Sequence, residues 1–159
     1  MKIPIGAIIV PGFAIAWTAA GAPSLGRKWF AFLLTLSILI SFALIYAGSC
    51  IESAHSPVFN GRAYSIAVTA EAVLIFLAVI VLRILNRKDL ILPIISLIVG
   101  LHFFGMVPAL GSNLYWWIGG AMSLLPILTM SILPRPVWNP VAGLSCAVIL
   151  WFAVICGFF

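Results

Sequence analysis

Residues 64–85 read YSIAVTAEAVLIFLAVIVLRIL, and the only charged side chains in this run are Glu71 and Arg83. The apolar core of a bilayer is about 30 Å thick, and about 20 helical residues cross it. A membrane-spanning β-strand would show about ten residues of alternating polarity, whereas here apolar residues follow one another without alternation. A segment surrounded by lipid must also satisfy its own backbone hydrogen bonds, which a helix does. The run therefore predicts a transmembrane α-helix.

Five further apolar segments of similar length flank this run. Clusters of proline, glycine, asparagine and charged residues separate them, as is typical of turns. Because the connections are short, we expect consecutive helices to be antiparallel neighbours. The predicted fold is all-α, a polytopic transmembrane bundle of six spanning helices in a single domain, residues 1–159. The predicted helices cover about residues 3–21, 29–49, 64–85, 90–110, 114–133 and 141–159.

The composition excludes an ordinary soluble domain. The chain is 65% hydrophobic and 7% charged, with a mean hydropathy of +1.30, whereas soluble domains carry about 25% charged residues. The net charge of +5 does not indicate nucleic acid as a partner, because the eight Lys and Arg residues lie mostly in short connections without interleaved aromatic residues. Membrane lipids are the expected surroundings.

The distribution of basic residues predicts the orientation, because cytoplasmic loops are enriched in Lys and Arg. Two basic residues, Lys2 and Arg62, lie on one side of the predicted bundle. The other six are assigned to the opposite, cytoplasmic side: Arg27, Lys28, Arg83, Arg87, Lys88 and Arg135. Both termini are then expected on the outer side.

The first segment also resembles a cleavable signal peptide, since Lys2 precedes an apolar stretch that ends in Ala20-Gly21-Ala22. Pro23 would then directly follow the cleavage point, and only one basic residue precedes the apolar stretch. We therefore expect a retained helix.

Glu71 and His102 are the residues whose position inside predicted helices needs an explanation. A charge at the bilayer centre costs about 2.5–3.5 kcal/mol or more. At about 1.5 Å per residue, Glu71 lies about 10 Å and His102 about 12 Å from the outer ends of their helices. The two helices are expected to be neighbours, so the side chains should meet in a hydrogen-bonded pair. Such a pair can serve as a proton relay or a small-ligand pocket, or as a purely structural clamp between helices.

Several other residues are candidates for the same site. Tyr46, Thr69 and Ser123 are predicted near the level of the pair, although serine and threonine in membrane helices usually bond their own backbone. Pro11-Gly12 is predicted to be a hinge, because proline removes a backbone hydrogen bond and broken helices often line transporter sites.

Metal and cofactor sites are not expected. One carboxylate and one imidazole supply two ligands, whereas zinc takes three or four from protein. Among the three cysteines, a disulfide between Cys50 and Cys156 would suit an oxidising outer compartment. Free, apolar-packing thiols are the alternative expectation.

The middle third of the chain carries a resemblance. Ala70-Glu71, Arg87-Lys88-Asp89-Leu90-Ile91 and Ile98-Val99-Gly100-Leu101-His102-Phe103 resemble a group of small, uncharacterised bacterial inner-membrane proteins that share a Gly-Leu-His-Phe signature after a basic turn. The resemblance implies a multi-pass protein of the bacterial cytoplasmic membrane, and it implies no activity.

Three functions remain open at this point. The leading hypothesis is a small carrier or ligand-binding protein with a polar pocket at Glu71 and His102, taking a proton or small molecule. The second is a non-catalytic accessory or assembly subunit, with a membrane-protein partner or a second copy of the chain. The third is an intramembrane enzyme acting on a lipid or quinone.

Overall fold

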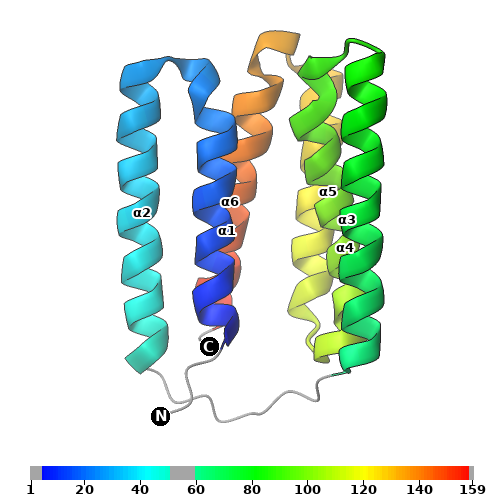
Figure 1. Cartoon of the computed structure of the whole chain (residues 1–159). Coiled ribbons are helices and arrows are strands. Elements are labelled where there is room, and N and C mark those ends of the chain that lie inside the picture. Colours follow the sequence, from blue (N-terminus) through cyan, green and yellow to red (C-terminus); the bar gives the residue numbers. More distant parts are fainter. Residues whose placement is uncertain (1–4, 51–59, 158–159) are drawn as a thin grey trace. The chain divides into compact units, whose positions relative to one another are not determined.

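A computed structural model of the protein describes residues 5–50 and 60–157. Within these ranges the chain is helical and contains no strand (Figure 1). Its six α-helices are α1 (Ile5–Gly21), α2 (Arg27–Cys50), α3 (Gly61–Ile84), α4 (Ile91–Leu110), α5 (Leu114–Ile132) and α6 (Trp138–Cys156). Three short 3-10 helices lie in the connections: η1 (Ala22–Leu25), η2 (Lys88–Leu90) and η3 (Arg135–Val137). The predicted all-helical fold is confirmed.

Among the described residues, five segments are long and apolar enough to cross a membrane: Arg27–Cys50, Gly61–Ile84, Lys88–Leu110, Leu114–Ile132 and Arg135–Cys156. The remaining helix, α1, has 17 residues. The described part of the chain therefore carries five to six apolar helices of spanning character. The side of the membrane on which the termini lie stays a prediction.

Three helices begin earlier than the sequence predicts. Gly26, at φ 95°, ends η1, and α2 starts at Arg27 rather than near residue 29. Asn60 caps α3, because its side chain accepts a hydrogen bond from the Ala63 N–H, and α3 starts at Gly61 rather than near residue 64. The start of α6 lies at Trp138 rather than near residue 141. Pro140 is tolerated there, because N–H groups in the first helical turn have no partner within the helix.

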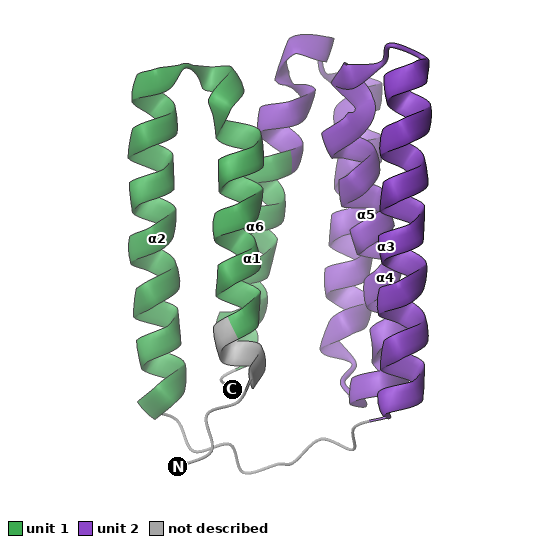
Figure 2. Ribbon diagram, in the orientation of Figure 1, with its two compact units in different colours: residues 1–56, 143–159 green, residues 57–142 purple. Residues whose placement is uncertain are grey.

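The chain divides into two compact units (Figure 2). Unit 1 comprises residues 1–56 and 143–159, and unit 2 comprises residues 57–142. Helix α6 therefore begins in unit 2 and continues in unit 1. Each unit is described by itself below.

Unit 1 is held together by a hydrogen-bonded serine that links three helices. The buried Ser41 hydroxyl of α2 donates to the Pro11 carbonyl of α1 at 3.0 Å and accepts the Trp151 indole N–H of α6 at 3.0 Å. Gly143 brings α6 against α1, since a Cβ there would lie 2.6 Å from Gly21 Cα. Small residues thus allow close helix approach, as is usual in membrane bundles.

Unit 2 is built around α4, which packs against α3 on one side and α5 on the other. A Cβ added to Gly105 would lie 3.3 Å from Ala67 Cβ of α3, and one added to Gly100 would lie 2.5 Å from Ser123 Oγ of α5. The Asn60 N–H also donates to the Ala109 carbonyl at 2.9 Å, which joins the start of α3 to the end of α4. This bond satisfies one of the carbonyls left free at the end of a helix.

Candidate functional site

The contact between α3 and α4 places the imidazole of His102 against the α3 backbone. The close approach at Gly105 and Ala67 occurs three residues after His102 along α4. At that spacing two helical residues lie on one face. His102 Nδ1 consequently reaches the carbonyl oxygen of Ala67, at 3.2 Å.

The structure also brings Glu71 to the same nitrogen. Glu71 lies four residues after Ala67, on the same face of α3, and its Oε2 is 3.4 Å from His102 Nδ1. The His102 side chain is 6% exposed and the Glu71 side chain 21% exposed. The imidazole is therefore almost enclosed by protein, while the Glu71 side chain is partly exposed.

The two acceptors around Nδ1 determine the position of one proton. A carbonyl oxygen accepts hydrogen bonds and cannot donate them. A deprotonated Nδ1 would place two lone pairs against each other at the Ala67 carbonyl, so Nδ1 carries a hydrogen that points toward Ala67 and Glu71.

The pair lies well inside the helices. Glu71 is ten residues from Gly61, the first residue of α3, and His102 is eight residues from Leu110, the last of α4. At about 1.5 Å per residue these positions are about 15 Å and about 12 Å along the respective helices. Both groups are therefore at one level, as antiparallel neighbours require.

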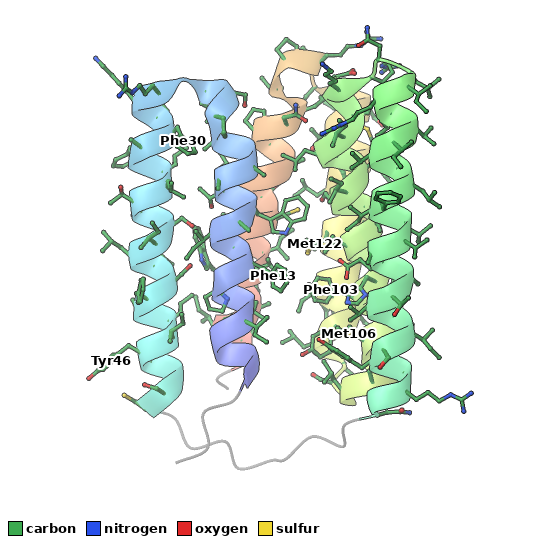
Figure 3. All side chains as sticks on the ribbon, in the orientation of Figure 1. Phe13, Phe30, Tyr46, Phe103, Met106 and Met122 are labelled. Carbon is green, nitrogen blue, oxygen red and sulfur yellow. The ribbon has the colours of Figure 1, made fainter. Side chains whose placement is uncertain are left out.

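The other candidate residues lie elsewhere. Thr69 is exposed on α3, about 200° around the helix from Glu71 at 3.6 residues per turn. Ser123 is buried at the contact of α5 with α4, next to Gly100, and its hydroxyl has no hydrogen-bond partner in the described part of the chain. Tyr46 belongs to unit 1 and is 73% exposed; its side chain points away from α2 in Figure 3. None of these three residues contributes a described contact to the pair.

The predicted hinge at Pro11-Gly12 lies inside a continuous helix. Helix α1 runs from Ile5 to Gly21 through Pro11, which is buried and whose carbonyl accepts the Ser41 hydroxyl. Gly12 is exposed, with nothing within 4 Å of a Cβ built on it. Pro11 is therefore part of the packing of unit 1, on the face of α1 turned toward α2.

The cysteines form no disulfide within the described residues. Cys50 and Cys156 are exposed, whereas Cys146 is buried. No group of three or more His, Cys, Asp or Glu side chains occurs within residues 5–50 and 60–157. His55 and Glu52 lie outside the described residues.

Sequence reasoning missed two contacts: the Ala67 carbonyl as a partner of His102, and Ser41 as the link between helices in unit 1. The Ala67 carbonyl has no signal in the sequence, because any residue supplies a carbonyl. Ser41 and Trp151 are 110 positions apart, and nothing in either segment predicts their contact. A serine in a membrane helix is expected to bond the preceding turn, and Ser41 instead bonds two other helices.

Comparison with known proteins gives no relative for this chain. No family model matches it, no curated protein matches it, and no solved structure matches it. The resemblance carried by Gly100-Leu101-His102-Phe103 therefore stays a prediction, and the functional argument rests on the geometry of the pair.

Proposed function

We propose that this chain is a small carrier of the bacterial cytoplasmic membrane, in which Glu71 and His102 together take up and release a proton. The observation that carries the proposal is the 3.4 Å contact between a carboxylate and an imidazole within two apolar helices. Intramembrane ionisable residues are rare and usually mark ion or proton pathways. A clamp between two helices needs only neutral polar groups, so these two residue types favour proton chemistry.

The charge of the pair explains how a proton could be exchanged for a ligand. With Nδ1–H fixed toward Ala67, the pair is neutral when it holds one further proton, on Nε2 or on the carboxyl group. Loss of that proton leaves a net charge of −1 about 12–15 Å from the helix ends. Such a charge is costly in the membrane, and a cation or a hydrogen-bond donor would compensate it. The Glu71 side chain is 21% exposed, and such a group would approach its exposed part.

Infrared difference spectroscopy of the protein in nanodiscs tests proton binding directly. Protonation of Glu71 should produce a carboxylic C=O band that changes with pH and shifts in D₂O. The Glu71→Gln variant should lack this band, and His102→Asn should move its midpoint. Asp89→Asn is the matched control, because Asp89 lies outside the α-helices in a turn ion pair with Arg87 at 3.1 Å, and it should leave the Glu71 band in place. A Glu71 carboxyl group that keeps one protonation state throughout the folded pH range would refute the proposal.

Proton transport across the membrane is tested by a separate measurement. In proteoliposomes with a trapped pH dye and an imposed potential, wild-type protein should show proton entry that Glu71→Gln abolishes. Equal flux through wild type and Glu71→Gln would exclude this pair as the route. If the pair binds and releases a proton but no proton flux is measured, the proton-binding site is supported and the carrier function is refuted.

A second candidate function is that of an accessory subunit in a larger membrane complex. The observation that favours it is that no residue of α3 is buried. This helix therefore presents a long apolar face to lipid or to another protein. Blue native electrophoresis of mildly solubilised membranes distinguishes the two functions. A band much larger than the 17.1 kDa chain that contains a second polypeptide would favour the subunit.

A further inference from the structure

A recess on the exposed face of α3 lies away from the Glu71–His102 pair. It has a volume of about 600 Å³ and is lined by Ser65, Ile66, Thr69, Ala70, Val73 and Leu74. The small side chains at positions 65, 69 and 70 form the hollow, and the next turn carries the large exposed side chains of Phe76 and Leu77. The recess is open rather than enclosed, and its lining comes from α3 alone, so it suits a chain that lies along the helix.

A positively charged side chain precedes the recess on the same face of α3. Arg62 precedes Ser65 by three residues and Ile66 by four, so it lies on the same face of α3. It is exposed, and it forms no ion pair within the described chain. Helical side chains tilt toward the helix N-terminus, which directs the guanidinium toward the aqueous end of α3 and away from the recess.

The dimensions match one leaflet of a bilayer. Arg62 and Leu74 are twelve residues apart, a rise of about 18 Å. Half of a bilayer with its headgroups measures about 20 Å. A guanidinium binds phosphate oxygens through two parallel hydrogen bonds. A phosphate on Arg62 would therefore place an acyl chain along the recess.

We infer that this face of α3 is a binding site for an anionic glycerophospholipid. Its phosphate binds Arg62, and one acyl chain lies in the recess between Ser65 and Leu74. The site does not involve Glu71 and is independent of the proposed carrier function, so Glu71→Gln should bind the lipid as wild type does.

Native mass spectrometry of delipidated protein, titrated with phosphatidylglycerol or phosphatidylcholine, tests this inference. Arg62→Gln should weaken phosphatidylglycerol binding about fivefold, the contribution of one basic residue near the membrane surface. It should also remove the preference over phosphatidylcholine. The matched control, Arg135→Gln, removes an exposed charge in the connection between α5 and α6 and should keep that preference.

Filling the recess tests the acyl-chain contact. Ala70→Phe should weaken binding of both lipids, whereas Ala72→Phe, on the same helix but outside the recess, should not. Both positions are exposed, so both variants should fold. Unchanged lipid preference in Arg62→Gln, or equal binding by Ala70→Phe and Ala72→Phe, would overturn the site. A dimer that Ala70→Phe alone dissociates would assign the recess to a second copy of the chain and also overturn it.

Discussion

The close approach of α4 and α5 at Gly100 makes Gly100→Ala an informative substitution for the packing of unit 2. A Cβ at Gly100 would lie 2.5 Å from Ser123 Oγ, 2.6 Å from Ser123 N and 2.8 Å from Met122 C. Two of these three atoms are backbone atoms, which a change of side-chain rotamer cannot move. The added methyl group must therefore push the two helices apart.

The size of the displacement follows from the distances. Ordinary van der Waals contact begins at 3.4 Å, and the nearest backbone atom is at 2.6 Å, so the helices must separate locally by 3.4 − 2.6 = 0.8 Å. Overpacking of this kind costs about 1–3 kcal/mol in a close-packed interior. Because α4 and α5 touch through small residues, separation also loses neighbouring contacts such as the 3.4 Å bond from the Ser96 hydroxyl to the Met122 carbonyl.

The assay is reversible unfolding in mixed micelles, with the free energy of unfolding compared between variants. Gly120→Ala is the matched control, because it lies on α5 with nothing within 4 Å of its Cβ. The same change should there leave stability unchanged or raise it by up to about 1 kcal/mol, because alanine favours the helix. We expect Gly100→Ala to lose about 1–3 kcal/mol relative to this control.

A double variant separates the side-chain contact from the backbone contacts. Adding Ser123→Ala to Gly100→Ala removes Oγ and leaves Ser123 N and Met122 C in place, so it should restore little stability. Equal stability of Gly100→Ala and Gly120→Ala would refute the reasoning. Full rescue by Ser123→Ala would show that the hydroxyl alone, and not the backbone, limits the approach of α5.

Two further predictions concern unit 1. Ser41→Ala should lower the free energy of unfolding by about 1 kcal/mol and change the Trp151 fluorescence, because the indole N–H loses its buried acceptor. The control Ser37→Ala should leave the free energy of unfolding unchanged, since the buried Ser37 hydroxyl has no partner within the described chain. Equal losses in both variants would contradict this role of Ser41. A membrane-impermeant maleimide should label intact cells at Cys50 and Cys156, which are exposed, and not at buried Cys146; labelling that requires cell lysis would reverse the predicted orientation.

The pairing of Glu71 with His102 could be anticipated, because both are costly at depth and lie on neighbouring helices. The placement of Thr69 could not be anticipated in the same way. Its closeness to Glu71 in sequence suggested a shared site, whereas two residues along a helix correspond to about 200° of rotation. Thr69 accordingly lines the recess on the other face of α3. The depth of a residue along a helix follows from counting residues. The direction of its side chain depends on which face of the helix meets the neighbouring helix.

Helix starts were less predictable than helix existence. Asn60 caps α3 through its side chain, and the apolar pattern alone placed that start about three residues later. The predicted last helix began near residue 141, after Pro140, whereas a proline within the first turn costs no helical hydrogen bond and α6 includes it. Hydropathy locates the apolar interior of a helix, whereas its first turn is determined by capping and backbone geometry.

The amino-acid sequence by itself determined that this chain forms apolar helices of membrane-spanning length. Long uninterrupted apolar runs have no other way to satisfy their backbone groups in lipid. Only the tertiary structure decided that His102 Nδ1 contacts both Glu71 and the Ala67 carbonyl, and that Ser41 joins Pro11 to Trp151. These contacts depend on the rotation and close approach of neighbouring helices, which glycine and other small residues permit without specifying the partner.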